Sequence, residues 1–318
     1  MPDSFPLKGV ILAAGFGSRM APLTNTTPKP LLPLGEHFLI DLALQKLREV
    51  GVEKIAVNTH HLSQKLKLWA DQQEGVSVFY EPKLLGTLGA FSPMTEWRGT
   101  SDLIVVNSDI YHSEPLTNFI AHYSREKPDI LMSTRSPSHA GANPLWVQND
   151  HTLIKIGGSQ PKQTQPHSFA CAQILNHRTL QSIPAGTQEL ATTYNQWLVA
   201  GKKINTLPSQ GRWIDLGTPQ DYYKAHFLRF HDSCNEWHHV PKGITEHIHA
   251  LTLHGPSYIS KDVLKKTNGT VGPGSIIYPG CQLSGSTVSQ SLLLPKTFCK
   301  DAESIDNQIR CQNISIAL

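Results

Sequence analysis

The sequence predicts an α/β protein in which helices cover both faces of a mainly parallel sheet, followed by a small left-handed β-helix-like domain. Short apolar runs alternate with segments of helical spacing as far as residue 135, which is typical of a parallel sheet. From about Ser257 onward, apolar residues recur every six positions, which is typical of a β-helix. A chain of 318 residues is long enough for one large domain and a smaller one.

The first expected element is a strand over residues 7–13, centred on Val10 and Ile11. A loop of small residues follows the strand, and two cations, Arg19 and the proline-flanked Lys29, follow the loop. Exposed backbone N–H groups together with two cations predict a polyphosphate-binding site. The loop residues expected to contact a nucleotide are Ala13, Ala14, Gly15, Gly17 and Ser18.

Two common phosphate-binding motifs do not fit this loop. A P-loop requires Gly-Lys-Ser/Thr, whereas Gly17 is followed by Ser18 and Arg19. The dinucleotide-binding fingerprint requires a third small residue, whereas this loop continues into Met20. The loop is therefore expected to serve another kind of nucleotide chemistry.

Further strands and helices follow in alternation. Strands are expected at residues 54–58, 76–80, 103–106, 168–175 and 204–207, with a hairpin over 145–156. Helices are expected at residues 38–50, 62–70, 188–200 and 220–230, and after Gly89, and Thr218 is the expected N-cap of the helix at 220–230. Because ligands bind at the carboxyl ends of parallel strands, we expect the loop, Glu81 and Asp109 to converge on one cleft.

Three regions are expected along the chain: a catalytic domain over residues 1–230, a His-rich linker over 231–256 and the β-helix-like domain over 257–318. Val271 and Ile277 illustrate the six-residue spacing of the last region. Since it has room for only a few coils, we expect it to serve packing or a homo-oligomer rather than catalysis. The His spacing of the linker fits no zinc pattern.

The composition excludes several classes of function. A net charge of +3 is too small to favour nucleic acid or an anionic membrane as a partner. No apolar run approaches the ~18 residues of a membrane span, and the N-terminus lacks a signal-peptide pattern. Five cysteines without a Cys-x-x-Cys pair indicate reduced thiols, so a cytoplasmic location is expected.

Two aspartates are candidate ligands of a divalent metal. Asp109 ends an apolar strand, and Asp215 stands between Trp213 and Gly217. Carboxylate oxygens suit Mg²⁺, which is therefore the expected cofactor. The alternatives are a helix N-cap role for Asp109 before the segment near Pro115, and a turn role for Asp215.

The segment Gly-Phe-Gly-Ser-Arg-Met at residues 15–20, continued by Pro-Leu-Thr at 22–24 and Pro-Lys-Pro-Leu-Leu at 28–32, closely resembles the signature of the sugar-1-phosphate nucleotidyltransferases. Residues 107–109 and 213–218 match the segments in which that family carries its two metal-binding aspartates. The resemblance implies a Rossmann-like nucleotidyltransferase sheet.

The same resemblance implies roles for particular residues. Arg19 and Lys29 would hold the triphosphate, and Asp109 and Asp215 would hold Mg²⁺. The backbone of the small-residue loop would contact the base and ribose. The segment from Gly86 to Gly89 resembles the Gly-Thr-x-Gly loop that lies near the base in that family, so Gly86 and Thr87 are expected to bind the nucleotide.

The sequence departs from the family pattern in the region that binds the sugar. The family's Glu-Lys-Pro segment lacks its Glu here, which leaves Lys162 after Pro161 as the candidate ligand of the sugar phosphate. The family's Asn-Ala-Gly segment is replaced by Phe-Ala-Cys-Ala at residues 169–172, which is similar to N-acetylmuramate-1-phosphate uridylyltransferases. Asn143, before Pro144, is the candidate for a contact with the sugar.

We therefore expect an enzyme that combines an NTP with a sugar 1-phosphate, most closely resembling the guanylyltransferases of mannose 1-phosphate and related hexose or heptose 1-phosphates. Glu81 favours GTP, because a carboxylate can accept hydrogen bonds from N1–H and the 2-amino group of guanine; its alternative is a solvated charge before Pro82. Two other functions stay open: a uridylyl- or thymidylyltransferase, and a nucleotide-sugar-binding regulatory subunit without activity. A bifunctional enzyme with an acyltransferase tail is disfavoured because the tail is short.

Overall fold

The computed structural model describes residues 7–136, 143–184, 189–230 and 237–318. Contacts divide the chain into two compact units. The first unit holds the described residues of Met1–Phe16, Pro28–Leu31 and Leu39–Trp213. The second holds Gly17–Thr27, Leu32–Phe38 and the described residues of Ile214–Leu318. The chain therefore passes between the units repeatedly within its first 39 residues.

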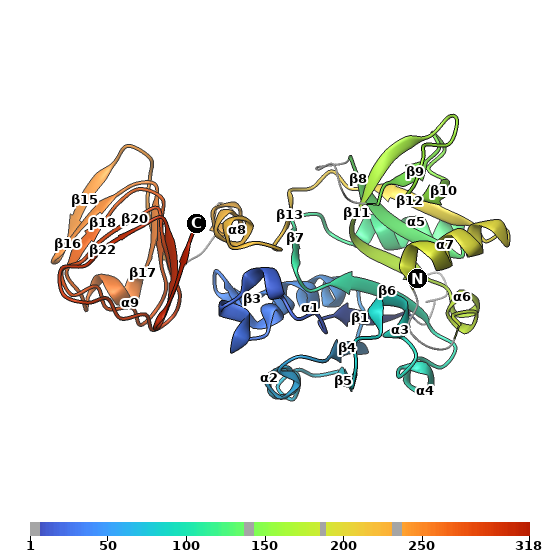
Figure 1. The fold of residues 1–318 in the computed structure, drawn as a ribbon, viewed down its shortest axis with the longest axis horizontal. Coiled ribbons are helices and arrows are strands. Elements are labelled where there is room, and N and C mark those ends of the chain that lie inside the picture. The colour runs from blue at the N-terminus through green and yellow to red at the C-terminus, as the bar shows by residue number, and fades with distance from the viewer. Residues whose placement is uncertain (1–6, 137–142, 185–188, 231–236) are drawn as a thin grey trace. The chain divides into compact units, whose positions relative to one another are not determined.

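The first unit is built on a sheet whose parallel part has the order β6-β1-β4-β5. Its strands are β1 (Leu7–Leu12), β4 (Ile55–Thr59), β5 (Val76–Tyr80) and β6 (Asp102–Asn107). β11 (Gln165–Leu175) extends the sheet antiparallel to β6. The expected mainly parallel sheet is confirmed, with an antiparallel extension on one side (Figure 1).

The extension contains the expected hairpin. β9 (Leu145–Val147) and β10 (Leu153–Ile156) pair antiparallel, and β9 also pairs with β11. On its other side β11 pairs with β8 (Ile130–Arg135), which runs parallel to β12 (Ile204–Pro208). β7 (Ile110–His112) follows β6 directly, and β13 (Trp213–Asp215) is the strand at which the chain leaves the first unit.

Helices cover both faces of the sheet because successive strand residues point to opposite sides. Ile11 packs in one core with α1 (Leu39–Glu49), α2 (Ser63–Ala70) and α5 (Thr117–Glu126). Val10, its neighbour, packs in the other core with α3 (Gly86–Gly89), α6 (His177–Gln181) and α7 (Leu190–Val199). The short α4 (Thr95–Arg98) joins the second core through Trp97.

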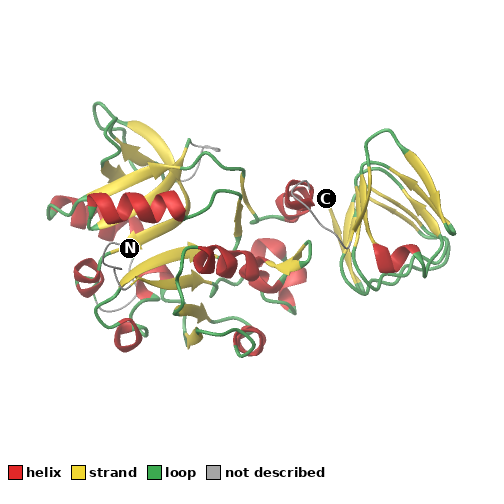
Figure 2. Cartoon of the chain, turned by 180° about the vertical axis from the view of Figure 1, so that it is seen from behind, coloured by secondary structure: helices red, strands yellow, loops and turns green. Residues whose placement is uncertain are grey.

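The second unit contains two stacked sheets of short strands (Figure 2). One has the order β14-β17-β19-β21-β23-β24 and the other β15-β16-β18-β20-β22. From β16 to β23 the chain alternates between the two sheets, and each of β16 to β21 pairs in parallel with the next strand of the same sheet. Their bounds are β14 (Trp237–Val240), β15 (Thr245–Ile248), β16 (Leu251–His254), β17 (Ser257–Ser260), β18 (Gly269–Val271), β19 (Ser275–Ile277), β20 (Thr287–Ser289), β21 (Leu292–Leu293), β22 (Ser304–Asp306), β23 (Gln308–Cys311) and β24 (Ile314–Ala317), with α9 (Lys261–Leu264) after β17.

The six-residue spacing accounts for this stack. Val271 and Ile277 are fully buried, and Ile277 pairs in register with Ile259 on one side and Leu293 on the other. Apolar residues at matching positions of successive coils therefore lie above one another and form a continuous core. The parallel stack agrees with the expected β-helix-like domain.

Two expected boundaries differ from the structure. Residues 237–254 are not a linker, since β14 pairs with β17, and β16 pairs with β18. The predicted domain end at residue 230 is also wrong, because α8 (Pro219–Phe230) belongs to the second unit. Phe230, at the end of α8, stacks on Tyr258 of β17 with ring centroids 4.7 Å apart. The aromatic face of this helix is therefore packed against β17. Residues 231–236 of the predicted linker lie outside the described residues.

A hydrogen-bonded segment near the N-terminus belongs to the second unit. β2 (Pro33–Leu34) and β3 (His37–Phe38) form a small ribbon. The Tyr222 hydroxyl of α8 donates to the Pro33 carbonyl, and the Gly35 N–H donates to the Tyr278 hydroxyl at 2.7 Å. No helix within the described part of the chain is long and apolar enough to cross a membrane.

Candidate active site

The carboxyl ends of the parallel strands in the first unit are connected by hydrogen bonds. Ser108, after β6, donates from its N–H and its Oγ to the Leu12 carbonyl at 3.2 and 2.7 Å. The Ala13 N–H donates to Asn58 Oδ1 at 2.7 Å, and Asn58 Nδ2 donates to Glu81 Oε1 at 2.7 Å. The sheet order β6-β1-β4-β5 places these strand ends side by side, so part of the predicted cleft edge is formed within this unit.

Lys29 and Asp109 form an ion pair at this edge, with Lys29 Nζ 2.7 Å from Asp109 Oδ2. The Lys29 side chain is only 8% exposed, whereas the Asp109 side chain is 36% exposed. The proline-flanked turn η3 (Lys29–Leu31) carries the cation. Asp109 is not a helix N-cap, because α5 begins at Thr117. The pair thus offers a fixed cation for phosphate and an accessible carboxylate oxygen for a metal.

Arg19 and Asp215 form a looser pair in the second unit, with Arg19 Nη2 3.9 Å from Asp215 Oδ2. The two side chains are 66% and 45% exposed, so water weakens their attraction and the guanidinium stays accessible to an anion. Gly217 permits the close approach of this cation, since a Cβ on Gly217 would lie 2.5 Å from Nη2.

Thr218, next to Gly217, caps helix α8 as the sequence predicts. Its Oγ1 accepts a hydrogen bond from the Asp221 N–H at 3.2 Å and donates to Asp221 Oδ2 at 2.7 Å. The cap fixes the residues that follow Asp215 and so limits how far that carboxylate can move.

The small-residue loop leaves space that the chain does not fill. Ala13 and Ala14 are buried, whereas Gly15 is exposed and a Cβ added to it would have no neighbour within 4 Å. The fold therefore does not require a glycine at this position, and a close-lying ligand would. Gly17 has a left-handed φ of 64° before the turn η1 (Ser18–Met20), and its carbonyl accepts from Thr24 Oγ1 at 2.9 Å.

Glu81 is 1% exposed, so the alternative of a solvated charge is wrong. Its Oε2 accepts from the Leu85 N–H at 3.0 Å, and its Oε1 accepts from Asn58. A base could use this carboxylate only by sharing or displacing one of these donors. Gly86, with φ 71°, begins α3, so the helix contains the Gly-Thr-x-Gly segment rather than following it, and Thr87 lies in its first turn.

The two candidates for the sugar lie on the antiparallel extension. Lys162 is exposed in the turn between β10 and β11, and no contact joins it to another predicted site residue within the described ranges. Asn143 is exposed beside Gly157, whose Cβ would lie 3.5 Å from Asn143 Oδ1. Their roles stay predictions.

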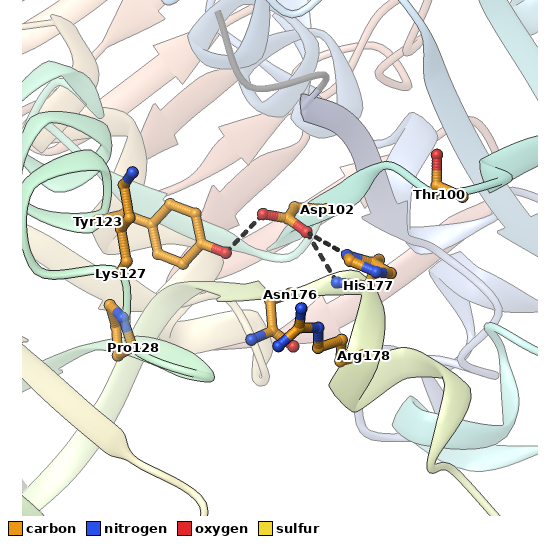
Figure 3. Close-up of a pocket in the computed structure, with 8 residues that line it drawn as sticks. All are labelled: Thr100, Asp102, Tyr123, Lys127, Pro128, Asn176, His177 and Arg178. Atoms are coloured by element: carbon orange, nitrogen blue, oxygen red, sulfur yellow. Dashed lines mark hydrogen bonds and ion pairs between the residues drawn. The ribbon is translucent and has the colours of Figure 1, made fainter. Parts of the chain in front are cut away.

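A separate pocket of about 500 Å³ opens at the other end of β6 (Figure 3). The Asp102 carboxylate there accepts from the Tyr123 hydroxyl and from the His177 backbone N–H, both at 2.7 Å. Burial raises the pKa of Tyr123, so the phenol keeps its proton and donates. None of the residues lining this pocket is a predicted site residue, and the hydrogen bonds of Asp102 hold α5 and α6 to the start of β6.

Asn58 is the residue that the sequence analysis missed. It follows the apolar residues Ile55 to Val57 and is 5% exposed, so a polar side chain at the end of a buried strand was the available signal. Within the described residues there is no group of three or more His, Cys, Asp or Glu side chains arranged to hold a metal ion. His238 and His239 of the predicted linker lie instead on β14, and His239 stacks on Tyr258 at 4.5 Å.

Comparison with known proteins agrees with this arrangement. The chain is 24% identical over 307 residues to a probable mannose-1-phosphate guanylyltransferase 1 of Oryza sativa subsp. japonica, covering 92% of this chain and 84% of that protein. It is 26% identical over 226 residues to the N-acetylmuramate alpha-1-phosphate uridylyltransferase of Neisseria meningitidis, covering 67% of this chain and 94% of that protein.

Solved structures show the same fold. A UTP-bound UGPase from Acinetobacter baumannii superposes with a TM-score of 0.61 at 18% identity, covering 72% of this chain and 94% of that one. Residues 8–142, which include β1, β4, β5 and β6 together with Lys29 and Asp109, match the family model described as nucleotidyl transferase. Residues 8–142 of this chain are therefore similar to the nucleotidyl transferases.

Proposed function

We propose that the chain joins an NTP to a sugar 1-phosphate, giving a nucleotide sugar and pyrophosphate. One observation carries the proposal: the segment that matches the nucleotidyl transferase family holds a buried Lys29 on Asp109 at the strand ends, beside a loop with open space at Gly15. The relatives named above are a guanylyltransferase and a uridylyltransferase of sugar 1-phosphates, which supports the same class of reaction.

The chemistry asks little of the protein beyond positioning and charge. A phosphate oxygen of the sugar 1-phosphate attacks the α-phosphorus, a new P–O bond forms, and the bond to the β-phosphate breaks to release pyrophosphate. The attacking oxygen is already ionised, so no general base is required. Lys29 and Arg19 would bind the phosphates and offset the charge that builds up on the transferred group.

Mg²⁺ fits the carboxylates that the sequence predicts for it. Asp109 and Asp215 both present partly exposed oxygen ligands, and hard oxygen ligands are those that Mg²⁺ prefers. When bound, the ion would supply positive charge to the phosphates. Each aspartate also has a cation as its partner: Lys29 would hold the Asp109 carboxylate in a fixed orientation, whereas the looser pair with Arg19 leaves the Asp215 carboxylate adjustable.

We further propose GTP and mannose 1-phosphate, or a related hexose or heptose 1-phosphate, as the preferred substrates. The relatives named as mannose-1-phosphate guanylyltransferases support this choice. Those named as uridylyltransferases favour the alternative of UTP. Lys162 and Asn143 are the proposed contacts to the sugar phosphate and the sugar, and the exposed extension that carries them is where substrate preference would be set.

A pyrophosphate-release assay that crosses GTP, UTP, dTTP and ATP with a panel of sugar 1-phosphates tests the proposal. We expect turnover with at least one pair, greatest with GTP and mannose 1-phosphate, and complete loss on addition of EDTA. Turnover only with UTP or dTTP would favour the alternative of a uridylyl- or thymidylyltransferase. No turnover with any pair would contradict the enzyme and favour a nucleotide-sugar-binding subunit.

Asp109→Asn tests the site within the same assay. We expect a loss of about a hundredfold or more in kcat, because the variant removes a carboxylate proposed to hold Mg²⁺ and leaves Lys29 without its anion. Asp71→Asn is the matched control, since Asp71 forms an exposed ion pair with Lys67 on α2 and should leave kcat unchanged. An Asp109→Asn variant with wild-type kcat would remove Asp109 from the site.

A further inference from the structure

A row of hydrogen bonds runs across the carboxyl ends of β6, β1, β4 and β5. Its central members are Asn58 and Glu81, which are 5% and 1% exposed. Asn58 links the Ala13 N–H to Glu81, and Glu81 links Asn58 to the Leu85 N–H. The backbone of Glu81 is held as well: its N–H donates to the Thr59 carbonyl at 2.7 Å. A carboxylate in contact with solvent would not require this many hydrogen bonds to protein groups.

The donors and acceptors of this row can be arranged in only one way. A backbone N–H can only donate, so Ala13 requires the oxygen of the Asn58 amide. The NH₂ group of Asn58 then donates to the Glu81 carboxylate. The second carboxylate oxygen accepts from Leu85. Glu81 therefore fixes which way the Asn58 amide points, and the amide fixes the position of the Ala13 backbone.

We propose that Asn58 and Glu81 are positioning residues for the nucleotide loop, with Glu81 acting through Asn58 rather than on the base. This inference rests on the proposed function and on the expectation that the backbone of Ala13 to Gly15 contacts base and ribose. The row reaches both segments of that site, because Ala13 begins the small-residue loop and Leu85 directly precedes Gly86 and Thr87 of α3.

The geometry favours positioning over direct recognition of guanine. Both oxygens of Glu81 already accept hydrogen bonds from the protein at 2.7 and 3.0 Å, and the side chain is buried. A guanine that took both oxygens would leave the buried Asn58 amide and the partly buried Leu85 N–H without these partners, which is unfavourable. The carboxylate instead supplies two acceptors in a fixed direction, which no neutral side chain of that length can do.

An exchange of the two side-chain types tests the proposal. In Glu81→Gln, the Gln amide can satisfy Asn58 or Leu85 but not both, and in Asn58→Asp two carboxylates face each other. The double variant Asn58→Asp/Glu81→Gln restores every hydrogen bond. The carboxylate now on β4 accepts from the Ala13 N–H and from the amide NH₂ at position 81, directly after β5, and the oxygen of that amide accepts from the Leu85 N–H. We expect each single variant to raise the KM for the NTP by about ten- to a hundredfold.

The double variant is expected to return the KM for the NTP to within about threefold of the wild type. The KM for the sugar 1-phosphate and the ratio of GTP to UTP turnover should change little in all three variants. Thermal unfolding verifies the fold of each variant, and should Asn58→Asp fail to fold, Glu81→Gln and the double variant still give the comparison.

Two outcomes would overturn the inference. If the KM for the NTP of the double variant is no lower than that of Glu81→Gln, the arrangement of donors and acceptors in the row does not control the loop. If Glu81→Gln changes the ratio of GTP to UTP turnover, and adding Asn58→Asp in the double variant does not reverse that change, Glu81 contacts the base directly. If the wild-type chain shows no turnover, the proposed function is contradicted, but NTP affinities of the same variants measured by calorimetry still test the positioning role. If the wild-type chain shows no affinity for an NTP, both the proposed function and the positioning role are overturned.

Discussion

At the scale of single residues, the ion pair of Lys29 with Asp109 combines a buried cation with an accessible anion. A phosphate that bound Lys29 would compete with Asp109 for the same ammonium group, and a metal on Asp109 would release the cation for that phosphate. The exposed pair of Arg19 and Asp215 is of the opposite kind, since its 3.9 Å separation and its exposure leave both side chains accessible to water. One pair is therefore preformed and the other is adjustable.

Gly15→Ala is the most specific test of a single position. Because Gly15 lacks a left-handed φ and its Cβ would meet nothing within 4 Å, the free chain should tolerate alanine and gain roughly 0.4–1 kcal/mol of stability. The methyl group would occupy the space proposed for the nucleotide, so the KM for the NTP should rise about tenfold or more. Thermal unfolding and steady-state kinetics measure the two effects, and an unchanged KM would place the nucleotide elsewhere.

The sequence was informative about residues whose role depends on local pattern. Lys29, Asp109 and Thr218 were predicted from a proline-flanked turn, a strand end and a helix start, and each lies in that setting. Asn58 was missed because its role depends on Ala13, which is 45 positions away in the chain. A partner so distant in sequence becomes visible only once the strand order is known.

At the scale of elements, α8 is fixed in the second unit by a chain of hydrogen bonds. His226 is fully buried; its Nδ1–H donates to the Tyr222 carbonyl at 2.8 Å, and its Nε2 accepts from the Tyr278 hydroxyl at 2.9 Å. Tyr278 in turn accepts from the Gly35 N–H. Both nitrogens of a neutral imidazole are thus satisfied, and this network sets how the helix meets the coils.

The stability of the second unit should depend on pH through His226. Burial lowers the pKa of His226 to about 4, whereas in the unfolded chain it stays near 6.5. Between these two values the unfolded state binds more protons, so stability is complete above pH 6.5 and falls as the pH drops toward 4, by about 3 kcal/mol. Denaturant unfolding between pH 4 and 7.5 measures this loss.

His226→Gln should flatten that pH dependence, although it also lowers stability throughout. His247→Gln is the matched control, because His247 is exposed on β15 and its removal should leave the slope as in the wild type. Equal slopes for wild type and His226→Gln would show that another group causes the loss.

Elements were predicted best where the apolar pattern is local and long. The runs of β1, β4, β5 and β6 and the helix α1 appear within one or two residues of expectation. The strands of residues 237–254 were missed because β14 and β16 acquire their partners from β17 and β18, and because their His residues suggested a linker. Polar residues are tolerated there since alternate positions of an outer coil face away from the core.

At the scale of the whole molecule, the chain is threaded through both units rather than divided at one point. Residues 17–27 and 32–38 belong with the C-terminal part, while 28–31 belong with the first unit. Sequence pattern cannot reveal such threading, because each of these segments is short and irregular. The predicted homo-oligomer through the β-helix-like part stays a prediction, which light scattering of the purified chain would test.

A chain that ends at residue 230 should be markedly less stable than the full chain. Truncation there would expose the aromatic face of α8, since His226 packs against Tyr278 and Phe230 packs against Tyr258. We expect a lower midpoint of thermal unfolding and self-association detected by light scattering. A chain ending at residue 312 loses only β24 and serves as the control; equal midpoints for the 230-residue and full chains would show that the catalytic unit is separable.

The threading also limits how this enzyme could be recombined with its relatives. A chimera that exchanged only the C-terminal coils would leave Gly35 facing a foreign surface, although its N–H is bonded to the Tyr278 hydroxyl. A functional graft must carry residues 32–38 along with the tail, even though Lys29 of the catalytic unit stands only three positions upstream of them. Crossover points for such chimeras therefore lie on both sides of residues 32–38, and these residues must be exchanged together with the C-terminal tail.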